Sequence, residues 1–526
     1  MFPDLWKERG VEKANTRGGW LSGFLAIFIT ALAALLGGYP DEGNTLTAQS
    51  AMGVERPNIL FVLTDDADSS LFRKMPEIEE RMRSKGKTFH NALVPFATCC
   101  PSRSTILRGQ YPHNHGVVAN SAPTGGLARY NRSGNHRDNL ATRLAAAGYR
   151  TGLFGKYLNE YRGEYIPPGW DEWHAAVGPY SNQKVYENGR FNEYDYRKRH
   201  ETEVFGEKAE RFVRSGQDTP WFAYVSFNSP HMPTYAEDRY ADEYSDEVSP
   251  RSPAFDEKDV SDKPAWVRRL PRVSDEDRES YDRQHRNRLR AMRSVDDAVA
   301  DLLGTLSETG QLDNTYVVLW NDNGWHMGQH RIPRGKRTAY EEDVRYPLVV
   351  RGPGVARDTN AGRLVSGADL MPTFLELAGA EVPDYVDGRS LVPLLSGERD
   401  VAWRDALLLE GYAEGFEKRE YTPPDFKAIR TADGRTYVEY STGEKELYDL
   451  GSDPDQVRSL HDAPEHRLEM EILSGRLDAL RDCSGDDCRA AEGHPGAALE
   501  SSENSPSTRS GERGRHQAVL GMSSVQ

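Results

Sequence analysis

Two adjacent cysteines, Cys99 and Cys100, carry the strongest chemical signal of the chain, which has four cysteines in all. Pro101 follows them and favours the first position of a helix, because its missing N–H would have no helical partner there. The next residues can continue that helix up to Gly109. Cys99 is therefore expected at a helix N-terminus, where free N–H groups and the helix dipole favour an anion. A sulfur in this place is a nucleophile or the precursor of one; the alternative is a buried structural thiol beside a helix cap.

Carboxylates and an amide follow two predicted strands. One buried strand ends at Asp65 and Asp66, and another leads to Asp322 and Asn323. Ligands of open α/β sheets lie beyond the carboxyl ends of the strands. Because carboxylate and amide oxygens suit Ca²⁺ or Mg²⁺, these pairs are candidate metal ligands. Each pair alone could also form an ordinary turn or helix cap.

Three cations and a histidine stand near the same predicted elements. Arg103 lies one turn beyond Cys99, on the same side of its helix. Lys156 follows the end of a predicted strand, and Lys336 stands in a basic loop that contains glycine. Nothing local distinguishes either lysine from a solvated surface charge. His231 follows a further predicted strand.

The pentapeptide at residues 99–103 has the form C-x-P-S-R and resembles the signature of the sulfatase family. The resemblance covers about residues 56–490. Further segments resemble the branch that contains the N-acetylglucosamine-6-sulfatases and the extracellular heparan 6-O-endosulfatases; they are residues 111–116, 154–161, 165–170, 341–354, 446–450 and 453–454.

This resemblance implies a modified residue and a metal. A separate formylglycine-generating enzyme would oxidise Cys99 to formylglycine, and a divalent cation, Ca²⁺ in preference to Mg²⁺, would complete the site. The metal ligands implied are Asp65, Asp66, Cys99, Asp322 and Asn323. The catalytic residues implied are the nucleophile Cys99, then Arg103, the sulfate-holding Lys156 and Lys336, and His231, which assists the leaving oxygen.

One departure from the family concerns the substrate side of the site. Many sulfatases read Gly-Lys-Trp-His after the second strand, whereas this chain reads Gly-Lys-Tyr-Leu-Asn at residues 155–159. Because leucine cannot donate a hydrogen bond, Asn159, His113 or His115 is expected to replace the missing histidine. The alternative for the histidine doublet is a polar loop without a role. His326 completes the candidate substrate-binding residues.

The function implied is that of a sulfuric ester hydrolase. Its substrate would be a sulfate monoester of an amino sugar or glycosaminoglycan, or an aryl sulfate. One alternative is a phosphodiester or phosphonate monoester hydrolase of the same superfamily. Another is a non-catalytic protein that binds sulfated carbohydrate.

Charge, cysteines and the N-terminus bound the partners and the compartment. The net charge of -16 argues against a nucleic-acid partner. Basic residues precede an apolar run at residues 20–36, which favours a signal peptide over an uncleaved membrane anchor. Cys483 and Cys488 are too isolated for a zinc site and predict a short-loop disulfide. We therefore expect a secreted or cell-surface protein.

The pattern of elements predicts an α/β fold. Apolar runs that alternate with helical segments favour a large mixed, mostly parallel sheet flanked by helices, which the resemblance makes alkaline-phosphatase-like. A hairpin signal and a late helix predict a smaller C-terminal subdomain of antiparallel strands plus a helix. The predicted divisions are 1–38 signal peptide or anchor, 39–55 linker, 56–400 catalytic domain, 401–490 C-terminal subdomain and 491–526 disordered tail.

Overall fold

A computed structural model describes residues 56–178, 184–195, 199–216, 219–397, 401–414 and 421–493. The predicted export segment and linker, and all but the first three residues of the predicted tail, lie outside the described residues. Among the helices of the described part, none has the length and apolar character needed to cross a membrane.

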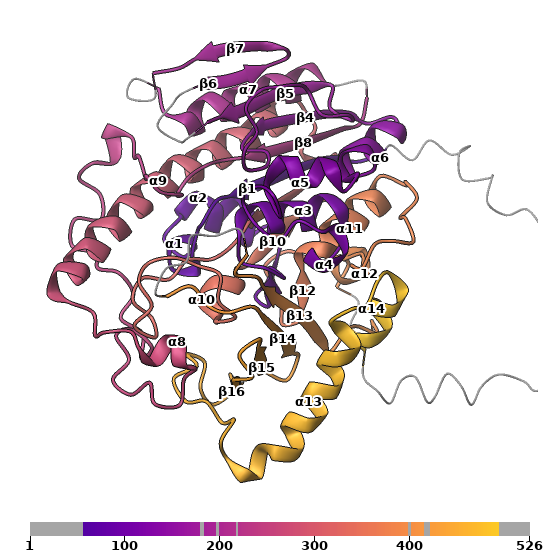
Figure 1. The fold of residues 1–526 in the computed structure, drawn as a ribbon. Coiled ribbons are helices and arrows are strands. Elements are labelled where there is room, and N and C mark those ends of the chain that lie inside the picture. Colours follow the sequence, from indigo (N-terminus) through magenta and orange to yellow (C-terminus); the bar gives the residue numbers. More distant parts are fainter. Residues whose placement is uncertain are drawn as a thin grey trace, which may run out of the picture. The chain divides into compact units, whose positions relative to one another are not determined.

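A large sheet dominates the described residues (Figure 1). Its ten strands follow the order β11-β2-β10-β9-β1-β8-β4-β5-β6-β7. The five strands from β9 to β5 run parallel, whereas β10, β6 and β7 pair antiparallel with their neighbours. The bounds are β1 Asn58–Thr64, β2 Lys87–Phe89, β4 Arg150–Gly155, β5 Glu172–Val177, β6 Lys184–Glu187, β7 Arg190–Glu193, β8 Trp221–Ser226, β9 Thr315–Asn321, β10 Leu348–Arg351 and β11 Thr359–Ala361. The predicted mixed, mostly parallel sheet is confirmed.

Helices cover both faces of this sheet. Trp221 and Phe222 are consecutive in β8, so their side chains point to opposite faces. Phe212 of α7 packs on Trp221 with ring centroids 5.9 Å apart, and Phe374 of α11 packs on Phe222 at 5.8 Å. The helices are α1 Ser69–Phe72, α2 Pro76–Ile78, α3 Cys99–Arg108, α4 Pro112–His115, α5 Gly126–Arg132, α6 Leu140–Ala146, α7 Glu201–Ser215, α8 Ala265–Arg268, α9 Asp275–Glu308, α10 Glu341–Val344, α11 Leu370–Leu377, α12 Val392–Leu395, α13 Arg467–Leu480 and α14 Asp486–Ala491.

The C-terminal part has its own small sheet. Strands β13 Ala406–Gly411, β14 Phe426–Thr431, β15 Arg435–Tyr440 and β16 Lys445–Asp449 form an antiparallel sheet in that order, as predicted. A further pair, β3 Ala92–Leu93 with β12 Val365–Ser366, is parallel. The predicted disulfide joins Cys483 and Cys488 just after α13. Glu492, in the first residues of the predicted tail, is buried.

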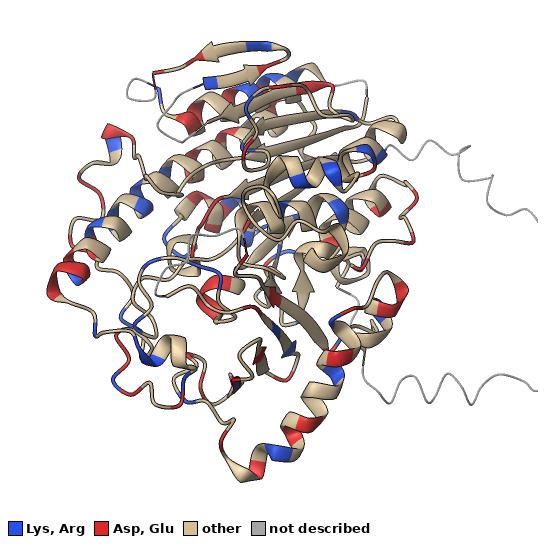
Figure 2. Cartoon of the chain, viewed as in Figure 1, with Lys and Arg blue, Asp and Glu red and all other residues tan. Residues whose placement is uncertain are grey.

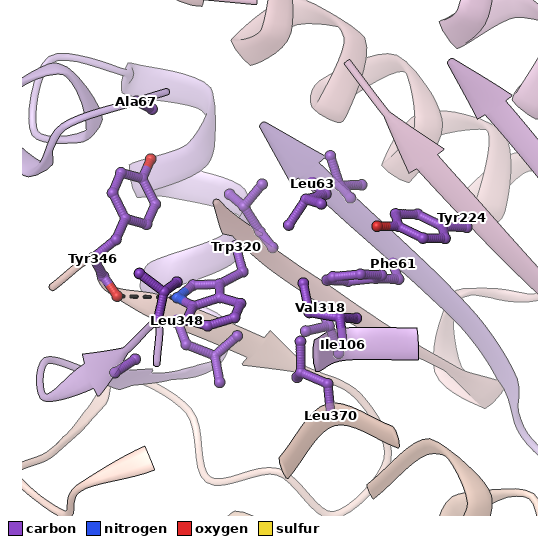
Figure 3. Packing of buried hydrophobic residues seen from close by; sticks show 14 of the residues in the cluster. Phe61, Leu63, Ala67, Ile106, Tyr224, Val318, Trp320, Tyr346, Leu348 and Leu370 are labelled. Atoms are coloured by element: carbon purple, nitrogen blue, oxygen red, sulfur yellow. Dashed lines mark hydrogen bonds between the residues drawn. The ribbon is translucent and has the colours of Figure 1, made fainter. Parts of the chain in front are cut away.

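The two strands that lead to the acidic pairs rest on a close-packed core (Figure 3). Phe61 of β1 packs against Tyr224 and Phe374 with ring centroids 4.9 Å and 5.4 Å away. Trp320 of β9 is buried, and its indole N–H donates to the carbonyl of Tyr346 at 3.1 Å. Since close-packed interiors resist displacement, β1 and β9 hold the residues that follow them in fixed positions.

Charges of both signs alternate along the exposed helices (Figure 2). Along α9, arginines stand close to aspartates and glutamates, and the same holds for α13. Helix α9 begins after Ser274, whose hydroxyl accepts the N–H of Asp277 at 3.1 Å.

Candidate active site

The candidate residues meet at the carboxyl edge of the central sheet. Four of its strands and one helix contribute, because parallel strands β1, β4, β8 and β9 end at the same edge and the start of α3 lies against them. The residues that meet are Asp65 and Asp66 after β1, Cys99 at the start of α3, Lys156 after β4, His231 after β8, Asp322 and Asn323 after β9, and Lys336 from the loop before α10.

Buried oxygen atoms make this site fit a divalent cation. Ligand atoms of Asp65, Asp66, Cys99 and His231 lie within 4.8 Å of one another. The Asp66 carboxylate is 1% exposed and its Oδ2 accepts no hydrogen bond within the described structure. Asp66 also has φ 63°, a left-handed conformation that is costly for a non-glycine residue and that marks a functional position. A buried carboxylate oxygen that accepts no hydrogen bond, among further carboxylates, belongs to the donor set of a hard cation.

Asp322 and Asn323 complete the acidic cluster. Asp322 Oδ1 accepts the backbone N–H of Asp66 at 3.2 Å, and Asn323 Nδ2 donates to Asp66 Oδ1 at 2.7 Å. Both residues are fully buried. The amide oxygen of Asn323 lies 3.2 Å from Lys336 Nζ, which also pairs with Asp66.

The two lysines are part of this cluster and not solvated surface charges. Lys156 is 7% exposed and forms an ion pair with Asp65. Lys336 pairs with Asp66, and its Nζ lies 2.8 Å from Cys99 Sγ. Burial disfavours the charged form of Asp65, but Lys156 and the other neighbouring cations lower its pKa to about 2. Both lysines thus present positive charge where an anionic substrate group would approach residue 99.

Arg103 ties four elements together beneath the cluster. Its side chain is 0% exposed, and its Nε donates to Asp322 Oδ2 at 2.8 Å. Its Nη1 donates to the carbonyl of Lys156 at 3.0 Å and to Ser226 Oγ at 2.6 Å. A guanidinium has five donors in a rigid fork, which lets one side chain join α3 to the ends of β4, β8 and β9. Ser226 was not predicted; the signal for it is a lone hydroxyl in an otherwise apolar strand.

Cys99 begins α3, two residues earlier than the proline implied. Thr98 is the extended residue before the helix, so Pro101 occupies the third helical position. That position also has no helical partner for an N–H, so proline costs nothing there. Cys99 Sγ is fully buried, 3.5 Å from Asp65 Oδ1. Burial and the nearby carboxylates raise the pKa of the Cys99 thiol, so the unmodified residue is a neutral thiol and a poor nucleophile.

His231 contacts the acidic cluster, and Asn159 has one unsatisfied side-chain oxygen among the described residues. His231 Nε2 is 3.4 Å from Asp66 Oδ2, and its Nδ1 faces the carbonyl of Met232. The backbone carbonyl of Asn159 accepts the N–H of Leu127 at 2.9 Å. The Asn159 Oδ1 atom is buried and accepts no hydrogen bond from the described residues. Asn159 thus remains the candidate for the missing family histidine.

The histidine doublet lies elsewhere. His113 Nδ1 contacts Glu410 Oε1 at 3.0 Å, and His113 Nε2 contacts the carbonyl of Cys483 at 2.9 Å. His115 Nδ1 accepts the N–H of Val117 at 3.1 Å, and its Nε2 lies 3.0 Å from the Thr105 hydroxyl. These partners belong to α3, the segment after α4 and the C-terminal part, so the contacts give no support to a substrate role for either histidine.

Acid should destabilise the fold through His115. Burial chiefly lowers its pKa to about 3, from an ordinary value of 6.5. Between these values the unfolded chain binds a proton that the fold does not, so stability falls as pH falls. Replacing His115→Asn keeps an acceptor for Val117 and should flatten this loss by up to about 4 kcal/mol. Thermal unfolding midpoints between pH 7 and 4 measure this loss of stability. The control is His461→Asn, because His461 is partly exposed. An equal dependence of the midpoint on pH in all three proteins would contradict the assignment.

His326 supports the Lys336 loop and does not face the cluster through its ring nitrogens. Its Nδ1 contacts Asp343 Oδ1 at 2.7 Å, and its Nε2 contacts the carbonyl of Pro333 at 2.9 Å. The backbone of His326 also exchanges hydrogen bonds with Gly335, the residue before Lys336. Although burial opposes it, Asp343 raises the pKa of the His326 ring above its ordinary value. Both ring nitrogens face oxygen atoms of neighbouring residues.

Loss of the His326 ring should therefore impair catalysis, although we expect the ring not to contact the substrate. We expect His326→Ala to lower kcat by about tenfold to a hundredfold, because the Lys336 loop loses two of its fixed points. Steady-state kinetics on an aryl sulfate measure the effect. The control is His90→Ala, since His90 bonds Asn360 at the surface. Unchanged kinetics in His326→Ala would show that the loop holds Lys336 without this ring.

Family comparisons agree with this geometry. The family model described as Sulfatase matches residues 57–380, which is more than half of the chain. The model described as N-sulphoglucosamine sulphohydrolase, C-terminal, matches residues 328–483. The chain therefore belongs to the sulfatase family.

Curated relatives share part or most of this chain. The putative extracellular sulfatase Sulf-1 homolog of Caenorhabditis elegans is 35% identical over 67% of this chain and 52% of its own length. The human N-acetylglucosamine-6-sulfatase is 32% identical over 84% of this chain and 87% of its own. The chain thus spans about half the length of the worm relative, and 33% of the extracellular sulfatase SULF-1 homolog of Drosophila melanogaster.

Solved structures share the fold. BT4656, solved in complex with its substrate D-glucosamine-2-N,6-O-disulfate, has a TM-score of 0.70 at 23% identity and covers 83% of this chain and 99% of its own. The phosphonate monoester hydrolase SpPMH from Silicibacter pomeroyi has a TM-score of 0.66 at 22% identity and covers 81% and 96%. Both support the predicted alkaline-phosphatase-like architecture.

Proposed function

We propose that this protein hydrolyses sulfate monoesters, with residue 99 as formylglycine and with a divalent cation bound by the acidic cluster. The observation that carries this proposal is the placement of Cys99. It begins a buried helix, its sulfur lies 3.5 Å from a carboxylate oxygen of Asp65, and Lys336 Nζ lies 2.8 Å away. A neutral buried thiol is a poor nucleophile, whereas a modified residue in the same place lies between metal ligands and cations.

The cation would be held by Asp65, Asp66, Asp322, Asn323 and residue 99, with Ca²⁺ preferred to Mg²⁺ because the oxygen ligands are many and charged. When bound, such a cation supplies Lewis-acid polarisation of the sulfate and of the nucleophile. Arg103 holds the Asp322 carboxylate in a fixed orientation for that purpose, since the two side chains pair at 2.8 Å inside the protein.

The chain's own cations bind the sulfate group. Lys156 and Lys336 offer point charges that stabilise negative charge on the sulfuryl oxygens, and they act in a buried site where such charges interact strongly. His231 acts at the leaving oxygen. Because its Nδ1 faces the Met232 carbonyl, that nitrogen carries a fixed proton, and Nε2 is the atom that gains and gives the transferable one.

The substrate proposed is a sulfated amino sugar or a glycosaminoglycan fragment. The relatives named N-acetylglucosamine-6-sulfatase support this class, as does the glucosamine disulfate bound by BT4656. We also propose export to the cell surface or beyond, which the relatives named extracellular sulfatases support. Maturation would then require a formylglycine-generating enzyme as a partner.

Two measurements test the proposal. Mass spectrometry of the tryptic peptide 88–103, from protein of the native host or from cells that contain the maturation enzyme, should show the aldehyde or its hydrate at residue 99. Rates on an aryl sulfate should exceed those on an aryl phosphonate monoester, the rival substrate that the SpPMH fold makes relevant. Unmodified Cys99 in such material would overturn the formylglycine route, and a preference for phosphonate would overturn the substrate class. Sulfated sugar bound without turnover would favour a binding protein.

A further inference from the structure

The loop that carries His231 is held at both ends by the start of α7. The loop comprises residues 228–235 and follows β8 (Figure 1). Two consecutive residues of α7's first turn, His200 and Glu201, reach its two ends. Neither residue was singled out from the sequence. For Glu201 the reason is that an acidic residue in the first turn of a helix is an ordinary stabilising feature.

Glu201 holds the first end with a single buried carboxylate. Its Oε1 accepts the backbone N–H of Asn228 at 3.0 Å, the N–H of Ser229 at 3.1 Å and the Ser229 hydroxyl at 3.3 Å. Its Oε2 accepts the side-chain amide of Asn228 at 3.1 Å. All these donors belong to the loop, so this carboxylate fixes both the position and the orientation of the chain there.

The same two loop residues contact the catalytic cluster through their backbone. The carbonyl of Asn228 accepts the N–H of His231 at 2.8 Å. The carbonyl of Ser229 accepts the N–H of Asp65 at 3.2 Å. Glu201 is therefore linked to His231 through one intervening residue and to a candidate metal ligand through another.

His200 holds the second end. Its Nδ1 accepts the N–H of Thr202 at 3.3 Å, so the other nitrogen, Nε2, carries the proton. That Nε2–H donates to the carbonyl of Tyr235 at 3.0 Å. With Glu201 at residue 228 and His200 at residue 235, the loop between them has little freedom to move.

The burial of Glu201 is difficult to explain as a stabilising feature alone. The side chain is 7% exposed, and among the described residues it forms no ion pair with lysine or arginine. A buried carboxylate without a cation is costly unless its hydrogen bonds are satisfied, and the donors that satisfy it are those of the loop. The dipole of α7 offsets part of this cost. The hydrogen bonds that offset the cost of burying the Glu201 carboxylate are therefore the ones that fix the loop.

We propose that Glu201 is a positioning residue for His231. It keeps His231 Nε2 directed at the leaving oxygen of the ester and does not itself touch substrate. This inference rests on the proposed sulfatase function for its catalytic consequence, whereas the loop attachment itself can be measured without any activity.

The test compares Glu201→Gln with Glu203→Gln, an exposed glutamate in the same helical turn. Glutamine keeps the size but replaces one acceptor by a donor, so it loses part of the loop contacts. For phenyl sulfate, whose phenolate is a poor leaving group, kcat should fall at least about tenfold. For 4-nitrophenyl sulfate, whose leaving group needs little protonation, it should fall less than about threefold, with KM little changed for both. In a His231→Ala background Glu201→Gln should add no further loss. Glu203→Gln should behave as the protein without substitutions.

Hydrogen exchange of the peptide that spans 228–235 provides the second readout. Glu201→Gln should accelerate its exchange, whereas a peptide from β8 should exchange unchanged. Equal losses on both substrates, additive loss in the His231→Ala background, or unchanged exchange would each overturn the inference. If the protein without substitutions, matured at residue 99, hydrolyses no sulfate ester, the proposed function fails. Hydrogen exchange of this loop alone then decides whether Glu201 holds it.

Discussion

Cys99→Ala should lower kcat for sulfate-ester hydrolysis at least about a thousandfold while the fold persists. Residue 99 supplies the nucleophile in the proposed reaction, and none of the neighbouring side chains can replace it. Lys156 and Lys336 are cations, and the carboxylates are engaged by Arg103, the lysines and the backbone. Alanine fits the first turn of α3 without strain, so folding should change little. Rates on 4-nitrophenyl sulfate and thermal unfolding measure the two effects separately.

Cys100→Ala is the matched control for this prediction. Cys100 is the next residue, is equally buried and, like Cys99, forms no disulfide in the described structure. Its thiol lies in the apolar core, whereas that of Cys99 lies against Asp65 and Lys336. The control should lose about 1–2 kcal/mol of stability through the missing sulfur and keep most of its activity. A comparable loss of activity in both variants, or an active Cys99→Ala enzyme, would contradict the role given to residue 99.

The positions of the acidic pairs could be predicted from sequence because they depend on local pattern. A continuous apolar run predicts a buried parallel strand, and parallel strands of one sheet end at the same edge. The structure brings Asp66 and Asp322 together accordingly, with 3.2 Å between the backbone nitrogen of one and the carboxylate of the other. The start of α3 was displaced by two residues, because proline is tolerated at any of the first helical positions and so does not fix which one it takes.

Contacts between distant segments could not be predicted from pattern. Lys156 and Lys336 have no local signal of burial, and only the family resemblance assigned them to the site. His113 and His115 are close to Cys99 in sequence, but their rings contact Glu410 and Thr105, and their substrate role stays a prediction. Direction of a side chain depends on the helix or turn that carries it, and a difference of one residue changes the face.

The supporting residues were the least predictable part of the site. His326 and Glu201 contact loops instead of the acidic cluster, His326 seven residues and Glu201 twenty-seven residues away in sequence. Such residues satisfy backbone groups that the strands leave unpaired at the edge of the sheet, a requirement that becomes visible only when the loops have known positions.

Asp322→Asn should remove both activity and the response to calcium. Asp322 is fully buried between the Arg103 guanidinium, at 2.8 Å, and the N–H of Asp66, at 3.2 Å. Asparagine keeps the shape but loses the charge that attracts a cation and that neutralises Arg103. We expect kcat to fall at least about a thousandfold and stability to fall by up to about 3–5 kcal/mol. We also expect calcium to raise the thermal midpoint of the unsubstituted protein, because a ligand that binds only the fold stabilises it, and not to raise that of the variant.

Asp369→Asn separates the metal effect from the cost of breaking a buried ion pair. Asp369 forms two hydrogen bonds of 2.6 Å with Arg404, and both side chains are fully buried, but this pair lies among other partners than the acidic cluster. It should lose stability as Asp322→Asn does, yet keep both the calcium response and the activity per folded molecule. If calcium stabilises Asp322→Asn as much as the unsubstituted protein, Asp322 is not a metal ligand. If Asp369→Asn loses the calcium response as well, the response reports overall stability and not binding at the acidic cluster.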